Sequence, residues 1–83
     1  MVRVAIDVAD PATAWRVRDA LASHPLLGGA TAQITVIATP QCVVLEGWTL
    51  DDQVKQLASR LARRAAGRCV VQMRLYSREQ QLI

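Results

Sequence analysis

The chain has 83 residues, which is the size of one small domain and excludes a pair of independent domains. Hydrophobic residues make up 52% of it and phenylalanine is absent, so we expect a core of aliphatic side chains. Ten Lys and Arg residues against seven Asp and Glu give a formal net charge of +3, which is too small to identify an acidic partner by itself. A chain this short buries only about 60 to 65% of its unfolded surface, so association with a partner that covers more of it is a reasonable expectation.

The first predicted element is a strand over residues 2–8, where apolar side chains recur at every second position. Its apolar face would contain Val2, Val4, Ile6 and Val8. Asp10 before Pro11 predicts a helix start, because an Asp side chain accepts the unpaired amide hydrogens of a first turn and proline fits the first helical position. That helix should end at about His24, since Pro25 disfavours helical geometry in the residue before it.

Two further strands are predicted on either side of a turn at Pro40–Gln41. On the first of them, one face holds Ile34, Val36 and Ala38, and the other holds Thr35 and Ile37. On the second, which covers residues 42–48, one face holds Val43, Leu45 and Gly47, and the other holds Cys42, Val44, Glu46 and Trp48.

A second helix is expected to begin near Thr49, which together with Asp52 three residues later resembles a capping box. Its apolar stripe consists of Leu50, Val54, Leu57, Ala58, Leu61 and Ala65. Gly67 is suitably placed to end the helix in a left-handed conformation. In a last strand over residues 69–75, the alternating faces hold Cys69, Val71, Met73 and Leu75 on one side and Val70, Gln72 and Arg74 on the other.

The resulting order, β-α-β-β-α-β, predicts an α+β fold. We expect a two-layer sandwich in which two helices cover one face of a mixed three- to four-stranded sheet. The connection between the third and fourth strands should be a right-handed crossover. Residues 1–76 would form a single domain, and residues 77–83 would form a C-terminal tail.

Two segments carry a resemblance to a known family. One is the apolar strand Val43–Leu45 with Glu46 and a closing Gly47, and the other is the helix containing Gln56-Leu57-Ala58 and Leu61-Ala62, followed by Gly67. Over about residues 12–75 the chain resembles a BON domain, a small bacterial module of α-β-β-α-β order, with an additional N-terminal strand. The resemblance implies a non-enzymatic domain associated with envelope proteins, phospholipid contact and attachment to larger assemblies.

No residue set in the sequence is typical of an active site, a metal site or a cofactor site, and we expect none of the three. His24 is the only histidine, and a capping or packing role fits it better than catalysis. Cys42 and Cys69 are predicted on opposite faces of the sheet, which argues against a disulfide between them. Adjacent Asp51 and Asp52 suit a helix start rather than acid–base chemistry.

The sheet face away from the helices is the candidate site. There the alternation places Ile37, Cys42, Val44, Trp48 and Val70, and a two-layer sandwich leaves that face uncovered. The alternative is that polar neighbours such as Thr35, Glu46, Gln72 and Arg74 break these residues into no continuous patch. Trp15 is expected on the exposed side of the first helix, either in an interface or packed against the loop around Leu26–Leu27.

A second candidate surface is basic and lies on the second helix. It contains Lys55, Arg60, Arg63, Arg64 and Arg68. Cations near a helix C-terminus also have a structural explanation, since they complement the helix dipole. An anionic membrane surface is the alternative partner for this cluster. Nucleic acid is disfavoured, because the first strand has no aromatic residue on which bases could stack and the last has at most Tyr76 at its end.

The sequence therefore favours a non-enzymatic interaction or assembly module over a ligand-surface binder. We expect a homo-oligomer, or a subunit of a larger assembly, that associates through the uncovered sheet face or the N-terminal edge strand. Asp7 and Asp10 interrupt the region where an export signal needs an apolar run of about 7 to 15 residues. Together with only two cysteines, this predicts a cytoplasmic protein.

Overall fold

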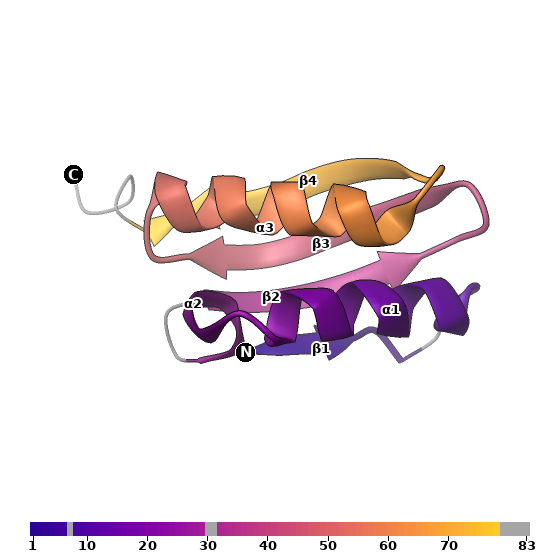
Figure 1. Cartoon of the computed structure of the whole chain (residues 1–83), viewed down its shortest axis with the longest axis horizontal. Helices are drawn as coiled ribbons and strands as arrows, with labels where there is room; N and C mark the ends of the chain where they lie inside the picture. The colour runs from indigo at the N-terminus through magenta and orange to yellow at the C-terminus, as the bar shows by residue number, and fades with distance from the viewer. Residues whose placement is uncertain (7, 30–31, 79–83) are drawn as a thin grey trace.

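A computed structural model describes residues 1–6, 8–29 and 32–78 of the chain. It confirms the α+β two-layer sandwich, with three helices against one mixed four-stranded sheet (Figure 1). The elements in chain order are β1 (Val2–Val4), α1 (Pro11–Ala22), α2 (Pro25–Gly28), β2 (Ala32–Ala38), β3 (Cys42–Thr49), α3 (Asp52–Ala66) and β4 (Val70–Ser77). The short helix α2 was not predicted and occupies the segment expected to be a loop at Gly28–Gly29.

The sheet has the strand order β1-β2-β3-β4, so sequence neighbours are also neighbours in space. β1 and β2 are parallel, β2 and β3 form an antiparallel hairpin, and β3 and β4 are parallel. The fold is thus two βαβ units joined at the centre by the hairpin. β1 and β4 form the two edges of the sheet in the described part of the chain.

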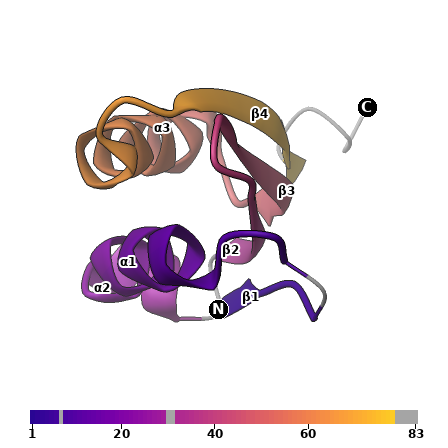
Figure 2. The same ribbon diagram turned by 90° about the vertical axis from the view of Figure 1, so that its right-hand side faces the viewer.

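The two βαβ connections have opposite hands. All helices lie on one face of the sheet, as Figure 2 shows. The step from β1 to β2 and the step from β3 to β4 move across the sheet in the same sense, because the strand order is β1-β2-β3-β4. The strands of the second unit, however, are antiparallel to those of the first. Only one of the two crossovers can then have the usual right hand, which about 98% of such connections adopt. Figure 1 shows that β3-α3-β4 is the right-handed one, as expected from the sequence, and that β1-α1-β2 is left-handed.

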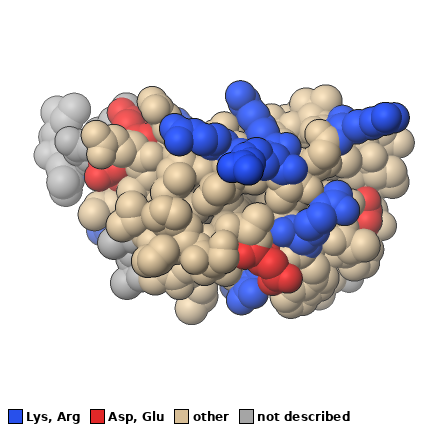
Figure 3. Space-filling model, in the orientation of Figure 1, with Lys and Arg blue, Asp and Glu red and all other residues tan. Residues whose placement is uncertain are grey.

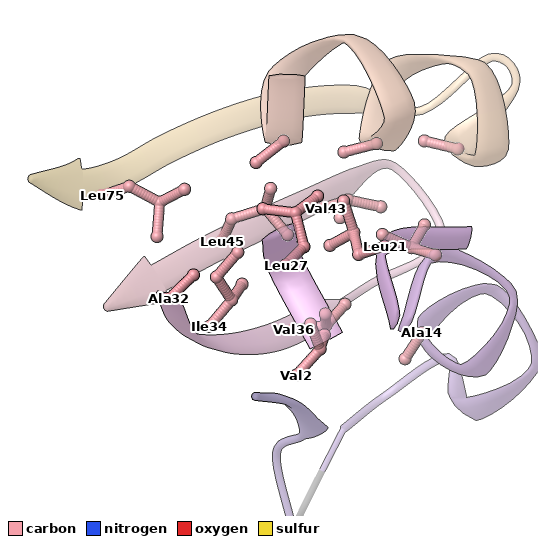
Figure 4. Packing of buried hydrophobic residues seen from close by; sticks show 14 of the residues in the cluster. Val2, Ala14, Leu21, Leu27, Ala32, Ile34, Val36, Val43, Leu45 and Leu75 are labelled. Carbon is pink, nitrogen blue, oxygen red and sulfur yellow. The ribbon is translucent and has the colours of Figure 1, made fainter. Parts of the chain in front are cut away.

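The core fills the space between the helices and the sheet (Figure 4). The inward-facing residues of the central strands, including Ile34, Val36, Val43 and Leu45, are fully buried, which confirms the predicted phase of both strands. The helices contribute Ala14, Val17, Leu21, Leu27, Val54, Ala58, Ala62 and Ala66. Because alanines form most of the buried face of α3, this helix can lie close to the sheet.

The first strand is shorter than predicted. β1 ends at Val4, and Ile6, which the alternation placed on the buried face, is 97% exposed. Beyond it, the Ala5 N–H donates to the Val36 carbonyl oxygen at 2.9 Å, and the Asp10 N–H donates to the Ala38 carbonyl oxygen of β2 at 3.0 Å. Asp10 is already the N-cap of α1, and the described residues between Ala5 and Asp10 are not in a strand, so the alternation beyond Val4 does not correspond to one.

Both ends of α1 follow local rules, but the helix stops earlier than expected. A carboxylate oxygen of Asp10 accepts from the Thr13 N–H at 3.3 Å, and the other oxygen accepts from the Thr13 hydroxyl at 2.8 Å. The helix ends at Ala22 rather than His24. His24 instead caps α2, where its Nδ1 accepts from the Leu26 N–H at 3.2 Å.

The predicted capping box of α3 was wrong by two residues. The N-cap is Asp51, whose Oδ1 accepts from the Val54 N–H at 2.9 Å, while the buried Thr49 still belongs to β3 and its hydroxyl donates to the Asp51 carbonyl oxygen. Leu50 consequently precedes the helix and is about half exposed instead of lying on the apolar stripe. The predicted position of the helix end was right, since Gly67 follows the helix, but its φ of 64° and ψ of −115° lie outside the left-handed α region.

The C-terminal boundary also differs from the expectation. Ser77, assigned from the sequence to the tail, is the last residue of β4, pairs with Thr49 and is completely buried. Residues 79–83 of the expected tail lie outside the described residues.

Candidate interaction surface

The face of the sheet opposite the helices is not covered by any described element (Figure 2). The strand register arranges its side chains in rows that cross the sheet. One row joins Ile37, Val44 and Gln72, and the neighbouring row joins Cys42 and Val70. Val70 is 63% exposed, whereas Ile37, Cys42 and Val44 are half-buried. These four apolar residues are cross-strand neighbours and form a compact group, which we call the apolar patch.

A polar row limits the apolar patch on one side. It consists of Arg3, Thr35, Glu46 and Arg74, one from each strand. The Arg3 Nε donates to the Thr35 hydroxyl at 3.2 Å, and Arg74 forms a 3.4 Å ion pair with Glu46. The sequence alone left open whether the apolar residues of this face form one patch or are broken up by polar neighbours. The structure has a continuous apolar patch at one end of the face and a polar row in the middle.

Beyond the polar row lies an aromatic pair. Trp48 is paired with Tyr76 on β4 and with Gln33 on β2. The guanidinium carbon of Arg78 lies 4.8 Å from the centre of the Trp48 ring, within the range of a cation–π contact. Trp48, a predicted contact residue, is thus separated from Val44 and Val70 by the polar row. The role of Tyr76 was missed, although continuing the alternation of Val70, Gln72 and Arg74 by one step would have placed it here.

Trp15 does not join the other predicted contact residues. It lies on α1 in the helical layer, is 52% exposed, and has the Arg18 guanidinium carbon 5.8 Å from its ring centre. Its exposure agrees with the helical wheel. A contact through Trp15 would use the opposite side of the molecule from the apolar patch.

The basic residues gather over the helical layer, as the space-filling view shows (Figure 3). Arg60, Arg63, Arg64 and Arg68 are exposed, Lys55 is half-buried, and none of these five forms an ion pair with another described residue. The Arg16 side chain of α1 extends this group, since its Nε donates to the Ala65 carbonyl oxygen at 2.7 Å. No sequence signal on α1 indicated this, because the approach of the two helices is a tertiary contact.

A shallow groove of about 230 Å³ runs between α3 and the edge strand β4. It is lined by Asp52, Lys55, Gln56, Ser59 and Met73. Its apolar contribution comes from Met73, and its two titratable groups are the exposed carboxyl group of Asp52 and the half-buried amino group of Lys55. Among the described residues no group of three or more His, Cys, Asp or Glu could hold a metal ion.

The residues considered for chemistry have structural contacts. His24 caps α2, and Asp51 caps α3. Cys42 and Cys69 are both free thiols; Cys42 lies on the uncovered face, while Cys69 packs against the core and its Sγ lies 3.6 Å from the Pro40 carbonyl oxygen. These contacts explain why each residue type suits its position.

In the part of the chain that the structure describes, no helix has the length and apolar character needed to cross a membrane. Comparisons with protein-family models, with curated proteins and with solved structures found no match for the chain.

Proposed function

We propose that this domain is a non-enzymatic, BON-like interaction and assembly module that associates with further copies of itself. The observation that carries the proposal is the apolar patch of Ile37, Cys42, Val44 and Val70 on a sheet face that no described element covers. Contiguous apolar side chains on an exposed face are typical of protein contact sites. The small size of the domain also supports self-association, since a partner on this face would increase the apolar surface that the short chain buries.

The position of Val70, the most exposed residue of the apolar patch, distinguishes this patch from a normal solvated sheet surface. Val70 begins an edge strand, where polar or charged residues usually prevent unwanted pairing, yet it is exposed beside Cys42 and one row from Val44. In the adjacent row of this face, Arg74 and Glu46 form an ion pair with each other. An apolar partner surface can therefore approach without leaving an unpaired charge buried.

Light scattering of the purified protein over a range of concentrations tests the proposal. The wild type should form dimers or larger species, and Val44→Asp should shift the population towards monomer because it places a charge in the centre of the patch. Gln53→Asp is the matched control, since it adds the same charge at an exposed position on α3. A wild-type protein that stays monomeric at the highest concentration reached would refute self-association.

One observation favours a second function, binding to anionic membrane surfaces. Arg60, Arg63, Arg64 and Arg68 are exposed without carboxylate partners among the described residues, and Arg16 adds to their charge. Each basic residue near an anionic lipid surface contributes about 1 kcal/mol of attraction. Sedimentation with phosphatidylserine-containing vesicles should then show binding that falls steeply with salt and is lost in Arg63→Glu/Arg64→Glu. Equal binding to neutral vesicles would exclude this function.

A further inference from the structure

The outer side of β4 is a ready site for strand pairing. In the parallel ladder with β3, the Val70 N–H donates to the Gln41 carbonyl oxygen at 3.1 Å, so the even-numbered residues of β4 direct their backbone groups to β3. The backbone groups of Val71, Met73 and Leu75 therefore point away from the sheet. No described strand lies on that side, and β4 spans eight residues.

The other edge of the sheet is less suited to pairing. β1 has three residues, and the outward carbonyl oxygen of Val2 already accepts from the Arg18 Nε at 3.3 Å. The expectation that the N-terminal strand is the pairing edge thus has less support than pairing through β4.

We infer that two copies of this chain associate through antiparallel pairing of β4 with β4, about a two-fold axis at Met73. The inference rests on the proposed self-association and adds an edge contact to it, because pairing through β4 leaves the apolar patch open on the uncovered face. Two four-stranded sheets would become one of eight strands. A two-fold axis makes the edge contact isologous, so the same edge serves both copies and this contact joins two chains and no more.

The register follows from the backbone and from charge. Only odd-numbered residues of β4 can exchange hydrogen bonds across the new interface, so the register can shift only in steps that keep odd positions paired with odd positions. With Met73 opposite itself, Val71 faces Leu75 and the paired region covers nearly the whole strand. On the uncovered face, Arg74 then lies opposite Gln72, whose side-chain oxygen can accept from it.

Neighbouring registers are worse for a physical reason. A shift towards the C-terminus places Arg74 directly opposite Arg74 of the other copy, and like charges in opposing positions destabilise a sheet. A shift towards the N-terminus centres the contact on Gln72 and pairs only residues 70–74, so the backbone groups of Leu75 lose the partner in β4 that they have in the inferred register. The sequence of β4 is therefore self-complementary in one register.

The groove beside β4 gives the same dimer an apolar contact on the helical side. Met73 lines that groove together with Gln56 and Ser59 of α3. In the inferred register the two Met73 side chains meet at the axis, and each can extend into the space beside the other's helix. A flexible thioether adapts readily to such an irregular gap.

Disulfide crosslinking in a Cys42→Ala/Cys69→Ala background tests the register. Met73→Cys should form a covalent dimer under mild oxidation, because opposing residues of a hydrogen-bonded pair have Cα atoms about 5.5 Å apart, within the range a disulfide bridges. Gln72→Cys is the matched control and should form no dimer, since its equivalents would lie about 8 Å apart, beyond the limit of about 7 Å. Crosslinking of Gln72→Cys without Met73→Cys would overturn the inference.

Met73→Pro tests the contact by a second route. Its N–H points away from β3, so proline there removes no ladder bond within the domain but blocks pairing with a second copy. We expect a folded chain by circular dichroism and, by light scattering, a smaller assembly than the wild type forms at the same concentration. If Val44→Asp dissociates the protein while Met73→Pro does not and Met73→Cys fails to crosslink, self-association stands and pairing through β4 is wrong. A wild type that is monomeric throughout refutes both.

Discussion

The substitution Gly47→Ala is the most direct test of the sheet geometry. Gly47 lies in the middle of β3 with a φ of 133°, a conformation that residues with a Cβ rarely adopt. A Cβ atom built at this position would lie 1.9 Å from the Gln33 carbonyl oxygen on β2. Because that oxygen belongs to the backbone of a central strand, it cannot move away as a flexible side chain could.

The expected cost has two parts. Forcing alanine into this backbone conformation costs about 1 to 3 kcal/mol. Moving a strand to relieve an overpacked contact costs about 1 to 3 kcal/mol more. The whole domain should be stable by only about 4 to 12 kcal/mol, from a typical stability per residue of about 0.05 to 0.15 kcal/mol. Gly47→Ala should therefore remove about half of the free energy of unfolding and, in a less stable background, leave the chain unfolded.

Gly67→Ala provides the matched control. Gly67 also has a positive φ, 64°, but a Cβ there would meet no atom within 4 Å. Its cost is therefore limited to the backbone term of about 1 to 3 kcal/mol, without the overpacking term that Gly47→Ala adds. Urea denaturation followed by circular dichroism, at one protein concentration for all variants, measures the free energy of unfolding of Gly47→Ala and of Gly67→Ala. The reasoning is refuted if Gly47→Ala loses no more stability than Gly67→Ala.

Three further substitutions test the local assignments by the same denaturation assay. Asp51→Ala should cost about 1 kcal/mol through loss of the α3 N-cap, whereas Asp51→Ser should retain most of the stability; equal losses would show that Asp51 is not the cap. Leu45→Ala should cost about 2 to 5 kcal/mol because Leu45 is fully buried, while Val70→Ala should change the stability of the monomer by less than about 0.5 kcal/mol. Ser77→Ala should raise stability by about 1 kcal/mol, since the buried Ser77 hydroxyl has no hydrogen-bond partner among the described residues. A loss in Ser77→Ala would instead indicate a partner for that hydroxyl.

Much of the fold was predictable because its signals are local. The alternation in residues 32–38 and 42–49 reports which side chains are buried, and the burial of Ile34, Val36, Val43 and Leu45 agrees with it. Asp10 and Gly67 mark helix ends through hydrogen bonding and backbone conformation within a few residues. The errors at Ile6 and Leu50 arose where an apolar residue continued a pattern beyond the end of its element, since periodicity alone contains no stop signal.

The candidate site was predictable in composition but not in arrangement. Strand phase placed Ile37, Val44, Trp48 and Val70 on one face, and the structure has them there. The alternation of β3 already places Glu46 between Val44 and Trp48, but only the register between strands shows that Arg74 lies beside Glu46 and extends the polar row across the sheet. The approach of Arg16 to Ala65 likewise depends on two helices that are distant in sequence.

The sequence by itself determined the class of the fold, the faces of the central strands, the start of α1 and the end of α3, because periodicity and capping act within a few residues. Tertiary structure decided which strands form the edges, how the rows cross the uncovered face, and that Gly47 must lack a side chain beside the Gln33 carbonyl group. Those features depend on contacts between segments far apart in the chain, where packing and strand register, rather than local preference, set the geometry.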